Sequence, residues 1–434
     1  MAYIALILFA SIFILILYGY PVAFTLGGIS VWYAFIFLEP SDFGALPPRI
    51  MGVMNNYVLL AVPLFVFMGI MLERSGVAKG LLETMAILFG KVRGGLAISV
   101  VIVGSLLAAS TGIVGATVIT MGLISLPTML KRGYQPELAT GTIAASGTLG
   151  QIIPPSVVLV LLGSVLNVSV GNLFAAALVP GMLLVVVYIV YILLIAKFKP
   201  NWAPAIDANE ISNFKENRFY LKVLEAFFLP FSLIVLVLGS IFFGLASPTE
   251  AAALGALGAT LLTFFQKKLT LSILKDVMRT TTHLTCMVFF ILIGATTFSF
   301  VFRELGGDLF LVNLIQDTEI SPNEFLFLVM LVVFVAGFFI DFIEIIFIIV
   351  PVVAPIFTAL EIDLIWVGIL LAINLQTSFL TPPFGFSLFY LRGVAPPEIT
   401  TNHLYRGILP YIIIQLLFLV LVIVFPEVIY LFIE

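Results

Sequence analysis

The sequence predicts an all-helical protein that crosses a membrane many times. Of its 434 residues, 62% are hydrophobic and only 10% are charged, and the mean hydropathy is +1.25. Soluble domains carry roughly 25% charged residues, so this chain is too apolar to be one. Its apolar runs of about 16 to 24 residues suit membrane-spanning helices, because β-barrel strands would alternate between apolar and polar residues.

The first half, residues 1–196, combines about five predicted spans with two irregular features. The apolar runs at 96–109 and 113–130 are both shorter than the roughly 20 residues that a hydrocarbon core requires. We therefore interpret 96–130 as a re-entrant helical hairpin. The segment 138–166 is long enough, but its "GTIAASGTLGQIIPPS" places Gly and a Pro-Pro pair where a helix should continue. It is predicted to be a broken helix.

The second half, residues 225–434, follows a polar cytoplasmic linker at 197–224 and has the same organisation. A span is expected at 284–302, and two short apolar runs predict a second hairpin at 325–360. A second broken helix is predicted at 364–391, where "NLQTSFLTPPFG" again leads polar residues into Pro-Pro.

Proline spacing predicts that the two halves are copies of one unit. Pro382-Pro383 follows Pro154-Pro155 by 228 residues, Pro355 follows Pro127 by 228, and Pro248 follows Pro21 by 227. Three matches at nearly one offset, each in a similar hydropathy context, indicate an internal repeat.

The basic residues predict the orientation of the two halves. With five crossings and one hairpin in each half, all of the 19 Lys and Arg residues except Arg49 and Arg303 fall on one side. The positive-inside rule makes that side cytoplasmic. Because five is odd, the second half is inverted, the two hairpins enter from opposite sides, and both chain ends lie outside.

Inverted repeats with hairpins and broken helices are typical of secondary transporters with a site near the bilayer midplane. Irregular backbone is tolerated there only where it is buried in protein or lines a watery cavity. Freed carbonyl groups and the hydroxyls of Ser146 and Thr148 would suit Na⁺, and the N-terminus of a half-helix would suit a carboxylate. The predicted Na⁺ ligands are Ser110, Thr111, Gly112, Ser146, Gly147, Gly150, Asp341, Asn374, Thr377 and Thr381. The predicted substrate-binding residues are Ser146, Thr148, Gln151, Asn374, Gln376 and Thr377, with Pro154, Pro155, Pro382 and Pro383 breaking the helices.

Each of these interpretations has a plainer alternative. Small residues at the first hairpin tip, "AASTGIVGAT", also favour close helix packing. Asp341 and Glu344 in "GFFIDFIEII" are costly inside a bilayer and indicate function, unless the tip reaches water and the acids are merely solvated. Asp341 is the better candidate of the two for a cation. Glu250, in "SPTEAAALG", is predicted to cap a helix that starts after Pro248.

Enzyme chemistry has little support in the sequence. There is no G-x-x-x-x-G-K-[ST] phosphate loop and no H-E-x-x-H motif, and no cofactor other than a coupling ion is expected. "AASG" at 144–147 is superficially similar to the serine motif of intramembrane proteases, but it lacks the leading Gly. The single Cys286 excludes an internal disulfide. A channel would not need two inverted hairpins, and no Lys/Arg-rich block suggests nucleic acid.

Five long motifs resemble one transporter family over nearly the whole chain. They are "GYPVAFTLG", "NNYVLLAVPLFVFMG", "PTMLKRGYQPELATGTIAASGTLGQIIPPS", "ASPTEAAALGALGA" and "NLQTSFLTPPFGFSLFYLRGVAP". Together they resemble the large membrane subunit of tripartite ATP-independent periplasmic (TRAP) transporters, in the ion-transporter superfamily. The resemblance departs at both tips, where Thr111-Gly112-Ile113 stands in place of the common Gly-Ser-Ser, and Phe342 and Ile343 follow Asp341.

The resemblance implies the mechanism and the partners. It implies Na⁺-coupled symport of an organic acid across the bacterial inner membrane by an elevator movement. The two hairpins and the two broken helices would move, surrounded by membrane lipid, against a scaffold formed by the other spans. A periplasmic substrate-binding protein and a small four-helix membrane subunit, expected as a separate polypeptide, would be the partners. The substrate is expected to be a small monocarboxylate or 2-oxo acid. The alternative is a stand-alone ion-coupled carboxylate transporter.

Overall fold

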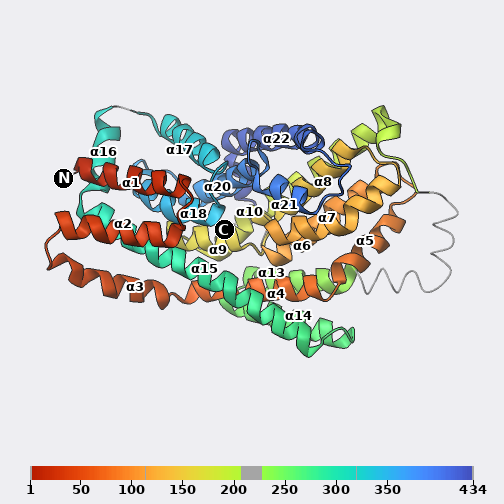
Figure 1. Ribbon diagram of the computed structural model, residues 1–434, viewed down its shortest axis with the longest axis horizontal. Coiled ribbons are helices and arrows are strands. Elements are labelled where there is room, and N and C mark those ends of the chain that lie inside the picture. Colours follow the sequence, from red (N-terminus) through yellow and green to blue (C-terminus); the bar gives the residue numbers. More distant parts are fainter. Residues whose placement is uncertain (1, 113, 207–226, 319, 433–434) are drawn as a thin grey trace.

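The computed structural model describes residues 2–112, 114–206, 227–318 and 320–432, and these ranges contain helices and no strand. Most helices run roughly along the long axis of the molecule (Figure 1). Six of the described helices are long and apolar enough to cross a membrane, or seven if one bent pair counts as a span. The predicted all-helical class is confirmed.

Ten α-helices form the first half, which ends at the 3-10 turn η4 (Pro200–Trp202). They are α1 (Ala2–Leu17), α2 (Val22–Phe37), α3 (Leu46–Met54), α4 (Ala61–Arg74), α5 (Val77–Leu88), α6 (Gly95–Thr111), α7 (Val114–Lys131), α8 (Pro136–Thr148), α9 (Val157–Leu166) and α10 (Val170–Phe198). Three further 3-10 turns join them, namely η1 (Asp42–Ala45), η2 (Tyr57–Leu60) and η3 (Leu149–Gln151).

The second half has a similar order of helices. They are α13 (Leu229–Phe242), α14 (Pro248–Phe265), α15 (Leu271–Glu304), α16 (Gly307–Asp317), α17 (Pro322–Ala336), α18 (Phe342–Ile348), α19 (Val350–Ala359), α20 (Leu364–Leu380), α21 (Phe386–Val394) and α22 (Thr401–Val424), followed by η6 (Pro426–Ile429). Most of the predicted linker, residues 207–226, lies outside the described residues.

Helix boundaries recur at the offset that the prolines indicate. Adding 228 to the bounds of α7 gives 342 and 359, where α18 begins and α19 ends. The same shift places α8 on α20 and α9 on α21 to within one residue at their starts. In Figure 1, α6 and α7 lie toward one end of the long axis, and α17 and α18 toward the other. The inversion relative to a membrane stays a prediction.

Several predicted boundaries were wrong. The span expected at 284–302 is part of α15, which has 34 residues and starts at Leu271. The short helices α3, α5 and α16 were not among the predicted spans. The second hairpin is irregular as well, because α18 and α19 meet at an angle of 50°.

Hydroxyl side chains start many of the long helices. Ser169, Ser247, Thr270, Ser321 and Thr400 each accept a hydrogen bond from a backbone N–H in the first turn of the helix that follows. Such N-caps satisfy donors that have no partner within the helix. Ser247 and Glu250 form a reciprocal capping box at the start of α14, which confirms the role predicted for Glu250.

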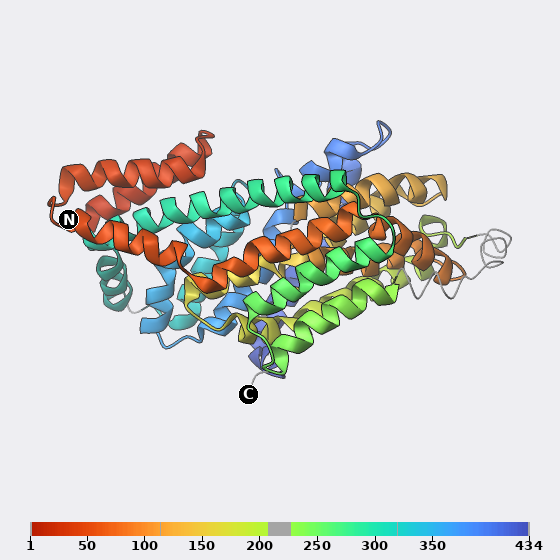
Figure 2. The ribbon, with the colours of Figure 1, turned by 90° about the horizontal axis from the view of Figure 1, so that it is seen from below.

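Longer helices surround the broken helices. On one side lie α4, α14 and α15, and on the other side lie α10 and α22. Figures 1 and 2 show α4, α14 and α15 running side by side, in agreement with their contacts. On the other side, α22 packs along α8, where Tyr411 and Thr142 share a hydrogen bond of 2.7 Å. Gln415 donates a 2.6 Å hydrogen bond to the Tyr188 hydroxyl, which ties α22 to α10.

Candidate functional site

The first helix break lies further along the chain than the sequence suggested. Ser146 and Thr148 belong to α8, which continues into the 3-10 turn η3 and ends at Gln151. The expectation that the whole stretch "SGTLGQIIPP", which starts at Ser146, is unwound is therefore wrong for residues 146–151. The irregular backbone is at 152–156 and contains a cis Pro154-Pro155 bond. Proline cannot donate the next helical hydrogen bond, so the helix stops there.

Ser156 joins the two ends of this break. Its hydroxyl donates a 2.8 Å hydrogen bond to the Gln151 carbonyl and caps the start of α9. Because Ser156 is fully buried, this short bridge fixes the relative position of η3 and α9 away from water. Sequence reasoning did not select Ser156, although a Ser after Pro-Pro at the start of an apolar run is a helix-start signal.

The hydroxyls predicted to bind Na⁺ near the first break are turned toward their own helix. Ser146 donates to the carbonyl of Ile143 at 3.1 Å, and Thr148 donates to that of Ala145 at 2.9 Å. A hydroxyl has one proton and two acceptor lone pairs. Because each hydroxyl donates its single proton to a helix carbonyl, its oxygen can only accept a further bond. The partial negative charge of that oxygen is therefore available to a cation.

The tip of the first hairpin packs directly on the break. Gly112 ends α6 with a φ of +60°, and a Cβ added there would lie 3.1 Å from the Val157 nitrogen. A Cβ on Gly150 would lie only 2.2 Å from the carbonyl oxygen of Ala108. Both glycines are thus required for close backbone approach. The side chains of Ser110 and Thr111 lie outside the described residues.

Gly147 allows α8 to pack closely against α7. A Cβ there would lie 2.4 Å from the Cγ2 atom of Val118 on α7. The plainer alternative, small residues that let helices approach, therefore accounts for this position.

Gln151 and Gln376 carry the strongest chemical signal in this region. Both side chains are fully buried, and neither the amide nitrogen nor the amide oxygen of either residue has a hydrogen-bond partner among the described residues. Buried polar groups are normally paired, and an unpaired one costs about 1–3 kcal/mol. The turn η3, which carries Gln151, contacts α20, which carries Gln376. Two unpaired amides on contacting elements indicate a polar ligand.

The second break has a backbone similar to the first. Thr381 ends α20, a cis Pro382-Pro383 bond follows, and Gly385, with a φ of +42°, precedes α21. Thr377 donates to the Ile373 carbonyl and Thr381 to the Thr377 carbonyl, each at 2.8 Å. These hydroxyls therefore follow the pattern of Ser146 and Thr148.

Asn374 and Ser378 connect α20 to the second hairpin. The Asn374 amide donates a 2.7 Å hydrogen bond to the carbonyl of Met330 on α17. Ser378 lies against Gly337, where an added Cβ would be 2.0 Å from the Ser378 hydroxyl oxygen. Asn374 therefore makes a structural hydrogen bond to α17, and its role in binding Na⁺ or substrate stays a prediction. Ser378 was not among the predicted site residues. Only the helical periodicity of α20 could have indicated that it faces the second hairpin.

Asp341 is the N-cap of α18. Its carboxylate accepts a hydrogen bond from the Phe342 backbone, and Glu344 accepts one from the Asp341 backbone at 3.2 Å. Both acids are half-buried. The carboxylates thus stabilise the start of α18.

Aromatic rings enclose the second break, in contrast to the first. The Phe342 and Phe379 rings are 5.8 Å apart, and the Phe379 and Phe386 rings are 5.1 Å apart. Phe339 lies 5.6 Å from Phe384. Phe342 and Phe379 are buried, whereas Phe339 and Phe384 are exposed at the surface of the break. Sequence reasoning did not anticipate this cluster, although the Phe residues of "GFFIDF" and "PPFGF" are the visible signal.

No group of three or more His, Cys, Asp or Glu residues in the described parts of the chain could hold a metal ion.

Comparison with known proteins identifies the family of this chain. The family model of the DctM component of tripartite ATP-independent periplasmic transporters matches residues 9–428.

The chain belongs to this family.

Curated relatives cover nearly the whole length. The C4-dicarboxylate TRAP transporter large permease protein DctM of Pseudomonas aeruginosa is 33% identical over 402 residues, 92% of either chain. The sialic acid large permease SiaM of Vibrio cholerae is 31% identical, covering 94% of this chain and 93% of that protein. The ectoine large permease TeaC of Halomonas elongata is 27% identical, over 97% of either chain.

One solved structure supports the fold. The YdaH transporter of Alcanivorax borkumensis matches with a TM-score of 0.63 over 90% of either chain, at 16% identity. The protein is therefore a TRAP large permease, a multi-pass inner-membrane protein from a family of transporter permeases rather than enzymes. As one component of a tripartite system, it works with a substrate-binding protein and a small membrane subunit.

Proposed function

We propose that this permease carries out Na⁺-coupled uptake of a small organic acid delivered by a periplasmic binding protein. The observation that carries the proposal is the pair of buried, unpaired amides of Gln151 and Gln376 on elements that contact each other. Amide N–H groups can donate to a carboxylate, so a bound anion would pair the N–H groups of both side chains and leave their amide oxygens as acceptors for a cation.

The hydroxyl groups near the breaks would hold the coupling ion. Ser146 and Thr148 on α8, and Thr377 and Thr381 on α20, each donate to their own helix. Their oxygens are left as acceptors, which is the ligand type that a small hard cation prefers. A bound Na⁺ beside the amides would lower the electrostatic cost of burying the substrate carboxylate, which couples the two ligands.

The substrate is proposed to be a monocarboxylate or 2-oxo acid. The relatives are named for C4-dicarboxylate, sialic acid and ectoine, each of which carries at least one carboxylate group. In this chain the second tip is closed by phenylalanines and contains Asp341. An apolar wall beside a carboxylate disfavours a second negative charge on the substrate.

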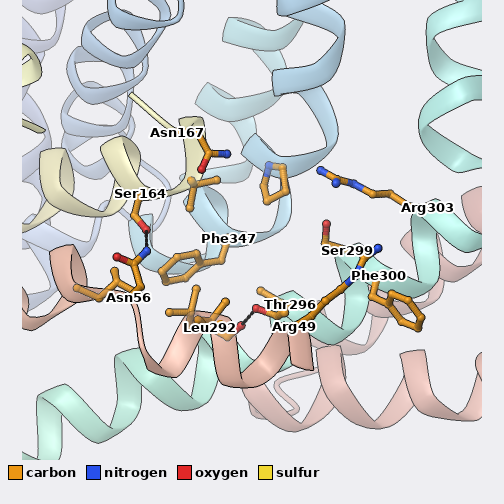
Figure 3. Close-up of a pocket in the computed structure, with 16 residues that line it drawn as sticks. Arg49, Asn56, Ser164, Asn167, Leu292, Thr296, Ser299, Phe300, Arg303 and Phe347 are labelled. Carbon is orange, nitrogen blue, oxygen red and sulfur yellow. Dashed lines mark hydrogen bonds between the residues drawn. The ribbon is translucent and has the colours of Figure 1, made fainter. Parts of the chain in front are cut away.

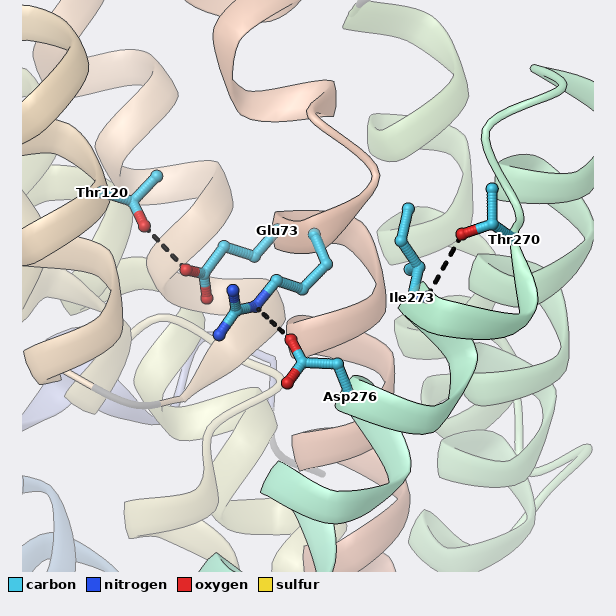
Figure 4. Close-up of polar contacts among 6 residues, drawn as sticks. Glu73, Thr120, Thr270, Ile273 and Asp276 are labelled. Atoms are coloured by element: carbon cyan, nitrogen blue, oxygen red, sulfur yellow. Dashed lines mark hydrogen bonds and ion pairs between the residues drawn. The ribbon is translucent and has the colours of Figure 1, made fainter.

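The proposed movement is of elevator type, and the chain is organised as two inverted units, residues 1–196 and 225–434, each of which contributes to the moving part and to the scaffold. The hairpins and broken helices would move against α2, α4, α14 and α15. Two hydrogen bonds cross the proposed boundary. Glu73 on α4 accepts one of 2.7 Å from Thr120 on α7, and Asn56 donates one of 3.1 Å to Ser164 on α9. Figure 4 shows the first of these beside the Arg74–Asp276 ion pair.

The test is uptake of labelled small carboxylates into proteoliposomes. Each compound is tried with and without an inward Na⁺ gradient, and with and without the binding protein and the small subunit. We expect uptake only when the gradient and both partners are present. Uptake by this chain alone would support a stand-alone carrier. An uptake rate that does not change with the Na⁺ gradient would contradict the proposed Na⁺ coupling.

A further inference from the structure

A pocket of about 330 Å³ lies away from the helix breaks, between the proposed scaffold and the proposed moving part (Figure 3). One wall comes from α3 and α15, and the other comes from α9, α18 and α19. The volume is at the lower end of the range for small-molecule sites, which begins at roughly 300 Å³. It suits a ligand of only a few heavy atoms.

The charge of this pocket is positive. Arg49 and Arg303 line it, and none of its lining residues is Asp or Glu. Arg49 has one ion pair, a long contact of 3.9 Å to Glu304 in which both side chains are well exposed. For Arg303, the described residues provide no ion pair. In Figure 3 the two arginines lie at the same end of the pocket, near Ser299.

The position of these two arginines in the sequence is equally distinctive. They are the only Lys or Arg residues that the predicted topology places outside the cytoplasm. Two cations in one pocket repel each other, and that repulsion is relieved when an anion binds between them. Guanidinium groups are well suited to this because they donate paired hydrogen bonds to a carboxylate.

The rest of the pocket can hold a short apolar group. It is lined by residues from both the proposed scaffold and the proposed moving part. Phe347 and Leu292 contribute apolar surface, while the Asn56–Ser164 hydrogen bond closes the other end. Because that bond joins the proposed scaffold to α9, a ligand in the pocket touches both parts. Occupancy would therefore change when α9 moves.

We propose that this pocket is a second anion site, which receives a short-chain carboxylate at the outer face before the carboxylate reaches the helix breaks. Arg49 and Arg303 bind the carboxylate group, and the Phe347 side holds the aliphatic part. The outer location rests on the proposed orientation of the chain. The binding itself does not depend on transport.

The probe for this site is 4,4,4-trifluorobutanoate, observed by ¹⁹F NMR with the permease and its small subunit in nanodiscs of phosphatidylcholine. The Gln151→Leu/Gln376→Leu background removes the proposed central site. We expect Arg49→Gln and Arg303→Gln each to weaken binding about tenfold. Arg303→Lys keeps the charge and retains most of the binding. Arg279→Gln, an exposed cation near the other end of α15, is the matched control with no change.

Three outcomes would overturn the proposal. Binding that is unchanged in both glutamine variants would remove the arginines from the site. Equal binding of the neutral 4,4,4-trifluorobutanol would show that the charge is irrelevant. Displacement of the probe by phosphatidylglycerol added to the nanodiscs would assign the pocket to a lipid headgroup. If the protein fails to transport any carboxylate but still binds the probe through the arginines, the proposed function falls and this site stands.

Discussion

Gln151 and Gln376 are the residues whose burial is hardest to explain by folding. Each buries an amide with no partner at either atom, whereas Asn374, Ser156 and the amide nitrogen of Gln415 each have one. A protein that only needed to fold would place an apolar side chain at these positions. The proposed substrate would supply partners for the unpaired N–H groups.

Gln151→Leu tests this directly. Leucine removes the unpaired amide, so we expect thermal stability to be unchanged or slightly higher. The KM for substrate uptake should rise roughly ten- to hundredfold, which corresponds to the loss of a hydrogen bond to a charged group, about 1.5–3 kcal/mol. Uptake kinetics and a thermal melt of the same preparation give both values.

Gln415→Leu is the matched control. This glutamine is also fully buried, but it donates to Tyr188. Its replacement should lower the stability by about 1 kcal/mol and leave the KM unchanged. If Gln151→Leu behaves like Gln415→Leu instead, the amide of Gln151 has a structural role and no ligand.

Asp341→Asn separates capping from cation binding. Asparagine is as good an N-cap as aspartate, so α18 should keep its start and the protein its stability. If the carboxylate also binds Na⁺, the Na⁺ concentration for half-maximal uptake should rise about tenfold. An unchanged Na⁺ activation curve would limit Asp341 to its capping role.

At the scale of the elements, the hairpin tips differ from each other. The first tip uses glycines to bring α6 within contact of the break, and the second uses aromatic rings to cover it. Each packs on both broken helices, because α7 contacts α8 and α21, while α17 contacts α20 and α18 contacts α9 from the other half. The four elements therefore form one packed unit, as a moving part requires.

Cross-linking tests whether this unit moves past the scaffold. In a Cys286→Ser background, Asn56→Cys and Ser164→Cys are joined by a short thiol cross-linker, since their native side chains lie 3.1 Å apart. We expect uptake to stop and to return when a cleavable linker is reduced. The control is Arg74→Cys with Asp276→Cys, an ion pair of 3.4 Å within the scaffold, where cross-linking should leave uptake intact. Continued uptake in the first pair would exclude motion of α9 against η2.

At the scale of the whole molecule, the long helix α15 relates the two membrane faces. The 34 residues of α15 extend over about 50 Å, more than enough to cross a bilayer. Lys275 and Glu304 lie at its two ends and are exposed. The predicted topology places Glu304 outside and Lys275 in the cytoplasm.

Labelling of single cysteines tests that topology. With Cys286→Ser as background, Glu304→Cys should react with a membrane-impermeant maleimide in spheroplasts, and Lys275→Cys should react only after permeabilisation. The reverse pattern would invert the assignment of both halves and move the Arg49–Arg303 pocket to the cytoplasmic face.

The sequence by itself determined the membrane environment and the helical class, and its Pro-Pro pairs marked the two places where helices are interrupted. These follow from composition and from proline and glycine, whose effects on the backbone are local. The predicted hairpin segment 113–130 agrees with α7 to within one residue at both ends, and the prolines mark both breaks.

Only the tertiary structure decided which polar groups lack a partner. Ser146 and Thr148 remain helical because packing against neighbouring helices stabilises α8, and their buried hydroxyls find partners within that helix. Gln151 and Gln376 are buried on elements that contact each other, and Arg49 and Arg303 line one pocket, through contacts between segments far apart in the chain. Burial and pairing depend on these long-range contacts, which no local pattern encodes.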